Sequence, residues 1–168
     1  CGLEEYSDGW GRSAVVVCAK PGGTPMGVIA VETRNADRRV SMDPANSEGC
    51  EAIEPQAGQV GLPDSAFKVA QALKDFNRGE NLSVRIFANW RGLSGGTRDA
   101  YGEISKYGVQ VVDAFVEYWH PVFACIPSGG ELRGGLWLVT HPAINPKKMG
   151  VYADVGSREQ LANLRKAE

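Results

Sequence analysis

The stretch LSVRIFANWRGLSGGT, residues 82–97, decides the fold, and the rest of the chain is arranged around it. Its first part, 82–88, alternates well enough between apolar and polar side chains to be typical of a β-strand. This strand leads into an arginine and three glycines, and an amphipathic helical pattern follows over residues 98–118. We therefore predict a strand, a glycine-rich turn and a helix in succession.

The predicted turn is suited to hold negative charge. Backbone N–H groups at a helix start lack partners within the helix, and the helix dipole places partial positive charge there. Gly95 and Gly96 let another molecule approach that backbone closely. Arg91 adds a full positive charge and a planar fork that matches a carboxylate. The sequence thus predicts an anion-binding site.

Apolar runs on either side of this stretch complete an α/β pattern. Residues 14–19 and 26–31 predict two strands of a hairpin around a turn rich in proline and glycine. Apolar spacings of three and four predict a helix over 63–76. The almost wholly apolar run 121–126 predicts a strand that is covered on both faces.

Three further segments are expected to have less regular structure or to lie at the margins of the fold. The polar segment 35–59 predicts mostly surface loop, with room for a short strand at 39–42. Residues 136–140 predict another strand, and residues 145–150 a short helix or turn. Residues 1–12, which are polar and punctuated by glycine, predict a loose lead-in.

The order of these elements predicts a largely parallel sheet. Crossovers of one hand bring the ends of successive parallel strands to the same edge. The loop with Arg91 should therefore lie beside the second glycine-rich loop, which contains Arg133, Gly134 and Gly135. We expect both arginines in one crevice at the carboxyl ends of the strands, where ligands of open α/β sheets bind.

Length and composition set the broad class. A chain of 168 residues suggests one domain with a sizeable core. A formal charge of −2 gives no electrostatic footprint for nucleic acid. No apolar run approaches the roughly 20 residues that a membrane helix needs. The chain begins at Cys1 rather than Met, which we interpret as a processed chain or a segment of a longer one.

Residues that commonly carry acid–base or metal chemistry are sparse. The four cysteines lie far apart without metal-ligand spacing, and we interpret them as reduced thiols of an intracellular protein. His120 and His141 each precede a proline at a strand edge, which favours a structural role. We expect no metal site and no protein base, so that the substrate or cofactor would supply the base.

Other interpretations of the glycine-rich turns stay open at this point. Residues 92–96 fit the G-x-S-x-G elbow of serine hydrolases, with Asp113 and His141 in the right chain order. Against this, Asp113 falls inside a predicted helix and the strands are too few for that fold. Both turns could also be free of ligand, and Arg91 could be exposed or part of a structural salt bridge.

At these residues the chain resembles the carboxyltransferase domain of eukaryotic-type, multidomain acetyl-CoA carboxylase. The resemblance depends on ordered strings that span nearly the whole chain. They are PMGVIAVETR at 25–34, DPAN at 43–46, GQV at 58–60, PDSAFK at 63–68, FN at 76–77, ANWRGLSGG at 88–96, GELRGG at 130–135 and YAD at 152–154. So many matches in family order are far more specific than any single glycine motif.

The resemblance implies a crotonase-like (ClpP/crotonase) ββα spiral, of which this chain is the second, C-terminal subdomain only. We expect a lead-in at 1–12, the subdomain at 13–154 and a divergent tail of helical composition at 155–168. The implied reaction moves a carboxyl group from N1 of carboxybiotin to the α-carbon of acetyl-CoA. The product is malonyl-CoA, for fatty acid synthesis, and released biotin can take the α-proton.

The same resemblance implies the partners of the chain. They are an N-terminal carboxyltransferase subdomain, a biotin carboxyl carrier domain and a second protomer, because the family active site forms between subdomains of two protomers. Biotin is the implied cofactor and acetyl-CoA the substrate, with ATP bound elsewhere in the parent enzyme. No metal in this domain, no nucleic acid and no membrane span are implied. A cytoplasmic location is implied, with the plastid as the alternative.

The site residues are carried over onto the matching positions. The Arg91 position contacts the carboxylate that is transferred, and the exposed glycine amides serve the biotin ureido oxygen or an enolate oxyanion. The implied catalytic set is Arg91, Gly95, Gly96, Gly134 and Gly135. The implied substrate- and biotin-binding set is Arg91, Leu93, Ser94, Glu131 and Arg133, where Glu131 and Arg133 order their loop by a salt bridge.

The chain also departs from the family pattern. Gly61 stands where a tryptophan is usual, Leu93 stands where an aromatic is common, and the sequence after 154 does not continue as the family does. These departures keep two other functions open. One is a binding or assembly module that keeps the fold without catalysis. The other is a carboxyltransferase for a different acyl-CoA or a crotonase-type hydrolase.

Overall fold

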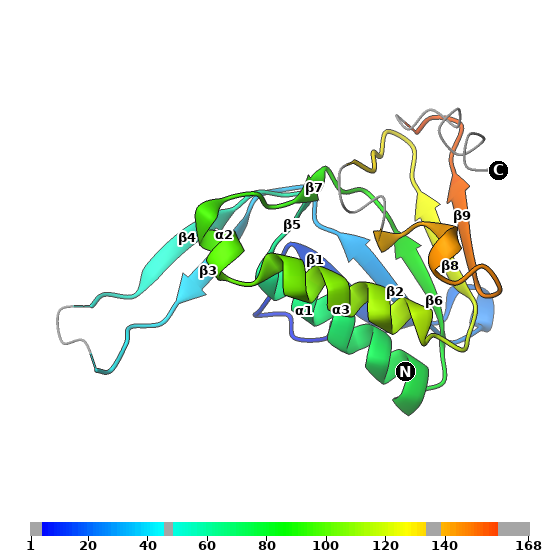
Figure 1. Cartoon of the computed structure of the whole chain (residues 1–168), viewed down its shortest axis with the longest axis horizontal. Coiled ribbons are helices and arrows are strands. Elements are labelled where there is room, and N and C mark those ends of the chain that lie inside the picture. The colour runs from blue at the N-terminus through cyan, green and yellow to red at the C-terminus, as the bar shows by residue number, and fades with distance from the viewer. Residues whose placement is uncertain (1–4, 46–48, 134–138, 158–168) are drawn as a thin grey trace.

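The centre of the fold is a five-stranded sheet with the strand order β1-β2-β6-β8-β9 (Figure 1). The structure is a computed structural model that describes residues 5–45, 49–133 and 139–157. The strands are β1 (Ala14–Ala19), β2 (Met26–Val31), β6 (Ser83–Phe87), β8 (Val122–Ile126) and β9 (Met149–Ala153). β1 pairs antiparallel with β2, and all other neighbours pair in parallel. The predicted hairpin and largely parallel sheet are confirmed.

Two helices cover one face of this sheet (Figure 1). α1 (Pro63–Lys74) lies between β2 and β6 in the chain and continues into a π-helical turn, η2 (Asp75–Gly79). α3 (Ile104–Val116) lies between β6 and β8. Their apolar stripes, including Leu73 and Phe115, pack on the inward side chains of the strands, such as Ile29 and Ile86. No helix of the described ranges is long and apolar enough to cross a membrane.

A close approach joins β2 to the end of α1. An added Cβ at Gly27 would collide with the ring of Phe76, which is itself fully buried. Glycine at this position therefore lets the aromatic ring lie directly on the strand. In the parallel pairing of β2 with β6, Gly27 lies opposite Val84.

The helix that we expected over 98–118 is broken, and the prediction of one continuous helix is wrong. α2 (Thr97–Tyr101) has five residues and ends at Gly102. Glu103 then adopts a left-handed backbone with φ 62°, and α3 begins after it. Because dipoles add along a helix, five residues provide only a small positive end near Gly96. The dipole argument for the glycine turn is weakened accordingly.

Segment 35–59 forms a two-stranded arm rather than mostly loop. β3 (Ala36–Val40) pairs antiparallel with β4 (Ala52–Gln56), and the pair projects from the body of the molecule (Figure 1). Two short strands, β5 (Val60–Gly61) and β7 (Gly92–Leu93), pair in parallel where the arm meets the body. The arm therefore continues directly to the glycine-rich turn.

The margins of the sheet also differ from expectation. The short helix or turn expected over 145–150 is present as a bend and turn at 145–148, and the edge strand β9 begins at Met149. A 3-10 turn, η3 (Pro142–Ile144), precedes it. Of the strand expected at 136–140, residues 136–138 lie outside the described residues. Val139 and Thr140 have helical and turn backbone, so the strand prediction is wrong for them.

The lead-in is attached to the body from residue 5 onward. The amide of Tyr6 donates to the carbonyl of Val16 at 2.8 Å, and its ring packs edge-on against Phe76 with centroids 5.6 Å apart. Lys68 Nζ, which is buried, forms an ion pair with Glu5 at 3.0 Å. Residues 5 and 6 are therefore held against the body of the molecule.

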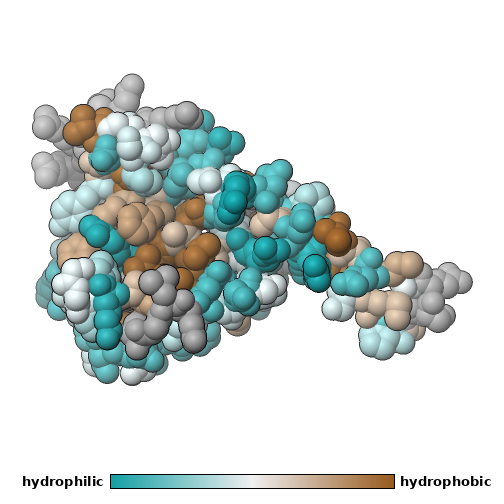
Figure 2. Space-filling view, turned by 180° about the vertical axis from the view of Figure 1, so that it is seen from behind, coloured by the Kyte–Doolittle hydropathy of each residue, from teal (hydrophilic) through white to brown (hydrophobic). Residues whose placement is uncertain are grey.

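The second face of the sheet is open within the described part of the chain and largely apolar, with Arg85 between Val28 and Phe123. Along β8, Val122, Ala124 and Ile126 are buried under the helices, whereas Phe123 and Cys125 point to the other side and are half-buried. The neighbouring outward side chains are Val15, Val17, Val28, Phe87 and Tyr152. Seen from behind, apolar residues gather on the body of the molecule, around a hollow (Figure 2). Helices cover only one face of β8, in contrast to the expectation for 121–126.

Candidate functional site

The site lies where the parallel strands β6 and β8 end. Since these strands are neighbours, the loops that follow them leave the same edge of the sheet. Trp90 and Leu132 form a parallel bridge, and the amide of Arg133 donates to the carbonyl of Trp90 at 2.9 Å. The prediction that the two loops lie side by side is confirmed.

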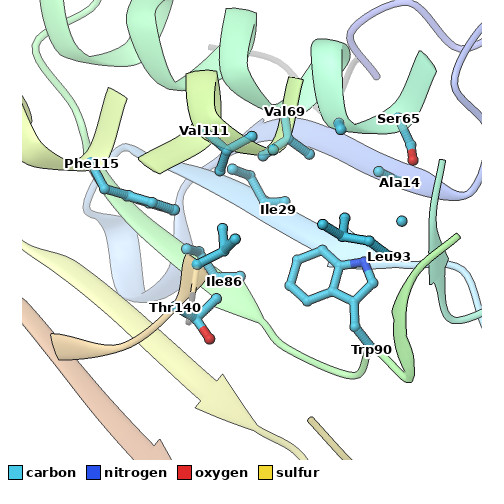
Figure 3. A pocket seen from close by; sticks show the side chains of 14 residues that line it. Ala14, Ile29, Ser65, Val69, Ile86, Trp90, Leu93, Val111, Phe115 and Thr140 are labelled. Atoms are coloured by element: carbon cyan, nitrogen blue, oxygen red, sulfur yellow. The ribbon is translucent and has the colours of Figure 1, made fainter. Parts of the chain in front are cut away.

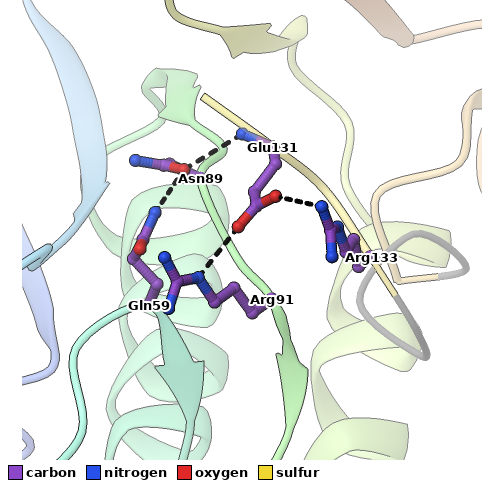
Figure 4. A network of polar contacts seen from close by, with 5 residues as sticks. All are labelled: Gln59, Asn89, Arg91, Glu131 and Arg133. Atoms are coloured by element: carbon purple, nitrogen blue, oxygen red, sulfur yellow. Dashed lines mark hydrogen bonds and ion pairs between the residues drawn. The ribbon is translucent and has the colours of Figure 1, made fainter. Parts of the chain in front are cut away.

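Two arginines meet at one carboxylate in this site (Figure 4). Arg91 Nε donates to Glu131 Oε1 at 2.8 Å, and Arg133 Nη2 forms an ion pair with Glu131 Oε2 at 2.7 Å. The Glu131 side chain is 5% exposed, whereas those of Arg91 and Arg133 are 58% and 66% exposed. The Arg133 contact is a charge pair without hydrogen-bond geometry. The expected convergence of both arginines and the salt bridge of Glu131 with Arg133 are present.

The geometry leaves binding capacity on both guanidinium groups. Arg91 uses only its Nε toward Glu131, so its terminal nitrogens Nη1 and Nη2 form a fork that faces solvent. Arg133 uses one terminal nitrogen, Nη2, for its ion pair with Glu131, which leaves its other guanidinium nitrogens available. Two positive charges against one buried carboxylate leave a net charge of about +1 in this cluster. That surplus matches a single carboxylate ligand.

The glycine turn opens on a neighbouring groove rather than on the arginines. Gly95 and Gly96 are exposed, and the amide of Gly96 has only a long contact of 3.5 Å with Ser94 Oγ. A groove of about 470 Å³ is bounded by Leu93, Ser94 and Gly95 on one side and by the arm on the other. Arg91 and Arg133 do not line it. The predicted single crevice is thus two adjacent parts, and Gly134 and Gly135 lie outside the described residues.

The arm closes the far side of this groove with an ion pair. Arg98 Nη2 lies 2.6 Å from Glu54 Oε2, which joins α2 to β4. The hydrogen bond from Arg98 lowers the pKa of Glu54 and raises the pKa of Arg98 in turn. The sequence did not predict this side of the groove, because β4 has no alternation of apolar residues that would mark it as a strand.

The serine of the turn is not arranged as a nucleophile. The hydroxyl of Ser94 forms a short hydrogen bond with the carboxylate of Asp99. A serine nucleophile instead needs a base such as histidine within reach, with a third group that orients it. Asp113 lies within α3, and His141 Nδ1 accepts from the amide of Ala143. The geometry does not support the serine hydrolase interpretation.

An apolar cavity lies behind the turn, between the sheet and both helices (Figure 3). The indole of Trp90 and the side chain of Leu93 point into it, and Gly61 lines it too. Its volume is about 30 Å³, far below the roughly 300–1,000 Å³ of ligand pockets. Trp90 is buried, as core packing requires. Leu93 therefore faces a packing cavity on one side and the outer groove on the other.

Two polar residues of the site escaped sequence reasoning. Asn89 Oδ1 accepts from Gln59 Nε2 at 2.7 Å and from the amide of Glu131 at 3.1 Å (Figure 4). Gln59 also accepts the amide of Arg91 on its carbonyl oxygen at 2.7 Å. Both residues lie within the strings that carried the resemblance, which was the only signal that could have marked them.

Apart from the arginine site, the cysteines and the potential metal ligands are further candidate reactive groups of the described residues. Cys50 and Cys125 have free thiols, whereas Cys18 is disulfide-bonded. The expectation of reduced thiols is therefore wrong for Cys18. Among the described residues, no group of three or more His, Cys, Asp or Glu side chains could hold a metal ion.

Fold and sequence comparisons identify the class of protein. The family model described as "Carboxyl transferase domain" matches residues 2–160, so the chain belongs to the carboxyl transferase domain family. Two solved structures share the fold. The chain aligns with the beta subunit of geranyl-CoA carboxylase from P. aeruginosa at a TM-score of 0.69 and 14% identity, over 99% of this chain and 27% of that one. With transcarboxylase 12S the TM-score is 0.67 at 18% identity, over 95% and 26%. The predicted crotonase-like fold is confirmed.

The sequence relatives are more specific. Acetyl-CoA carboxylase of Schizosaccharomyces pombe is 52% identical over 156 residues, which are 93% of this chain and 7% of that protein. A Saccharomyces cerevisiae relative named "Acetyl-CoA carboxylase, mitochondrial" is 52% identical over 154 residues, 92% of this chain and 7% of the relative. The chain thus spans about 7% of the length of these curated relatives. The predicted resemblance to multidomain acetyl-CoA carboxylases is confirmed.

Proposed function

We propose that this chain is the C-terminal, biotin-side half of the carboxyltransferase of an acetyl-CoA carboxylase. In this role its arginine site binds the carboxyl group that passes from carboxybiotin to acetyl-CoA to form malonyl-CoA. The observation that carries the proposal is the solvent-facing fork of Arg91, which is held from behind by the buried carboxylate of Glu131. The relatives named acetyl-CoA carboxylase support the choice of reaction.

The arginine cluster suits the carboxylate of carboxybiotin, and the groove beside the arm suits its ureido oxygen. Arg91 Nη1 and Nη2 can bind both oxygens of a carboxylate in parallel, which fixes its plane. The exposed amides of Gly95 and Gly96 can donate to a ureido oxygen in the adjacent groove. Biotin, when bound, supplies the carboxyl group and afterwards a nitrogen that can take the α-proton. Arg91 holds the carboxyl group, and Leu93 and Ser94 shape the wall between the two parts.

The chain's own carboxylates in the site are not free to act as the base. Glu131 is held between Arg91 and Arg133, and Asp99 is hydrogen-bonded to Ser94. Both carboxylates are thus already engaged with neighbouring side chains of the site. We therefore propose that biotin, rather than Glu131 or Asp99, takes the α-proton.

The open apolar face of the sheet is the proposed contact with the N-terminal carboxyltransferase subdomain. Half-buried Phe123 and Cys125 and exposed Phe87 and Tyr152 would be covered there. We compare alkylation of Cys125 in the 168-residue chain and in the full-length protein that carries it, with exposed Cys50 of the arm region as the control. We expect Cys125 alone to become protected. Equal reactivity of Cys125 in both proteins would contradict this contact.

The remaining parts of the assembly are proposed from the relatives. A biotin carboxyl carrier domain would present carboxybiotin, and a second protomer would complete the dimeric site. We infer a cytoplasmic location from the family resemblance, with the plastid as the alternative; one S. cerevisiae relative is named mitochondrial. Microscopy of the tagged full-length protein distinguishes cytoplasm, mitochondrion and plastid.

The test of the reaction uses the full-length protein that carries this chain. Arg91→Ala should abolish malonyl-CoA formation while the protein stays folded, because the fork is removed at an exposed position. Arg78→Ala is the matched control, since Arg78 is also an exposed arginine paired with a carboxylate, that of Glu117, at 2.6 Å. Normal turnover by Arg91→Ala would refute the proposed role. Assays with acetyl-, propionyl- and longer acyl-CoA then define the acceptor.

A further inference from the structure

Asn89 connects three loops of the site through a single oxygen atom. Asn89 follows Ala88, just beyond the end of β6. The amide of Ala88 donates to the carbonyl of Cys125 in β8 at 2.8 Å, which is the last hydrogen bond between the two strands. Asn89 Oδ1 then accepts from Gln59 Nε2 and from the backbone amide of Glu131 (Figure 4). Gln59 precedes β5 and Glu131 belongs to the loop after β8. One side chain thereby fixes the spacing of segments that are distant in the sequence.

The orientation of the Asn89 amide follows from its partners. A backbone N–H can only donate, so the Asn89 atom that faces the Glu131 amide must be the carbonyl oxygen. The Gln59 atom that faces the same oxygen must then be its NH₂ group. The network therefore has one consistent set of donors and acceptors, and an amide flip at either residue would leave two donors or two acceptors in contact.

These bonds close a ring that contains the site arginine. Glu131 Oε1 accepts from Arg91 Nε, and the amide of Arg91 donates to the carbonyl of Gln59 at 2.7 Å. Gln59 donates to Asn89, and Asn89 accepts the amide of Glu131. Both the backbone and the guanidinium of Arg91 are thus held by residues that Asn89 joins. Arg133 is linked to the same ring through Glu131 Oε2.

We propose that Asn89 is a positioning residue for carboxyl transfer, whose Oδ1 fixes Glu131 and through it the plane of the Arg91 fork. The proposal rests on the proposed function. A carboxylate bound by two parallel bonds is sensitive to the angle of the fork, and a displacement of about 1 Å in a reacting group can cost on the order of 100-fold in rate. Asn89 itself need not touch the substrate.

Two variants of near-equal shape separate positioning from bulk packing. Asn89→Leu removes the acceptor, whereas Asn89→Asp keeps an oxygen for both donors. In the full-length protein we expect Asn89→Leu to lower kcat for malonyl-CoA formation about 10- to 100-fold with KM for acetyl-CoA changed less than about twofold. Asn89→Asp keeps the acceptor but adds a negative charge beside the arginines, so it should lose clearly less kcat than Asn89→Leu without matching the unaltered protein. Equal losses in both variants, or an unchanged kcat in Asn89→Leu, would overturn the proposal.

A second measurement keeps the inference testable if Asn89→Leu does not fold. Gln59→Met removes the Nε2 donor but keeps the backbone carbonyl that binds Arg91, and it should lower kcat less than Asn89→Leu and in the same direction. If the network acts through Glu131, adding Gln59→Met to Glu131→Gln should cause little further loss of kcat. If the fold-losses of kcat from Gln59→Met and Glu131→Gln simply multiplied in the double variant, the two residues would act independently, which would contradict the ring. Activity retained by Arg91→Ala would instead show that the proposed function, rather than the positioning, is at fault.

Discussion

Arg91 and Arg133 bind opposite oxygens of the same buried carboxylate, at 2.8 Å and 2.7 Å. They come from loops that follow two neighbouring parallel strands, so the topology of the sheet places them together. The shared partner, Glu131, prevents the two guanidinium groups from repelling each other and turns their free nitrogens outward. A pair of arginines that would otherwise be mobile on the surface is thereby held ready for an anion.

The stability of the fold should depend on Glu131 more than on an exposed ion pair. Glu131→Gln removes the charge that both arginines contact, and we expect a loss of about 1–2 kcal/mol in the free energy of unfolding. This is less than the 3–5 kcal/mol of a fully buried pair, because both arginines face water. Glu32→Gln is the control, since its partner Arg34 is mostly exposed, and it should cost less than about 1 kcal/mol. Urea unfolding measures both values. Equal costs would contradict the structural role of Glu131.

Gly95 should be replaceable without loss of the fold. An added Cβ there meets no atom within 4 Å, and its φ is not in the left-handed region. Gly95→Ala should therefore change the free energy of unfolding by less than about 0.5 kcal/mol. If a ligand approaches the amide, the extra methyl should still lower kcat/KM at least several-fold.

Gly58→Ala is the contrasting variant for that experiment. A Cβ at Gly58 would collide with the carbonyl oxygen of Thr33 and come within 2.6 Å of that of Arg34, so the fold itself should be destabilised. Thermal unfolding and steady-state kinetics on both variants provide the comparison. Unchanged kinetics in Gly95→Ala would mean that no ligand atom lies close to this amide.

The alkaline stability of the protein should report on Tyr118. Its phenol is buried and donates to the carbonyl of Leu82 at 2.8 Å, and burial raises its pKa well above the ordinary value of 10.0. A raised pKa in the folded state contributes stability that is complete below pH 10 and is lost as the pH rises toward the folded-state pKa. Tyr118→Phe should cost about 1 kcal/mol at pH 7 and should flatten the decline of unfolding free energy above about pH 10.

Tyr101→Phe is the matched control, because Tyr101 is exposed on α2. Urea midpoints at about pH 7 and pH 10.5 measure the effect of each substitution. The same pH dependence in Tyr118→Phe and in the unaltered protein would show that Tyr118 does not carry the alkaline loss.

The sheet and the arginine site were predictable because burial leaves a pattern in the sequence. The runs 14–19 and 26–31 match β1 and β2, since one side of each strand lies in the core and apolar residues recur. The convergence of Arg91 and Arg133 followed from the parallel order of the strands alone. The salt bridge of Glu131 with Arg133 could be proposed only from the resemblance, and the contact of Glu131 with Arg91 was not predicted, because a single carboxylate in a loop has no periodic signal.

The arm and the helix break were not predictable, for the opposite reason. β3 and β4, with sequences ADRRV and AIEPQ, bury little and so lack alternation. The apolar stripe of the expected long helix continues through Gly102 and Glu103, although Glu103 has a left-handed backbone. Nothing in the local sequence marks that conformation for a glutamate. As a result the sequence placed Gly95 in the arginine crevice, whereas it lines the groove beside the arm.

The central claim is that Arg91 acts as a fork preset by Glu131, and not only as a positive charge. The most direct test is the rate of carboxyl transfer to acetyl-CoA by the full-length protein with Arg91→Lys, compared with Arg91→Ala and with the control Arg78→Lys. Lysine keeps the charge but cannot bind Glu131 and offer two parallel donors at once. We predict that Arg91→Lys loses at least about 100-fold, close to Arg91→Ala, while Arg78→Lys is unaffected. A rate within a few-fold of the unaltered protein in Arg91→Lys would contradict the account.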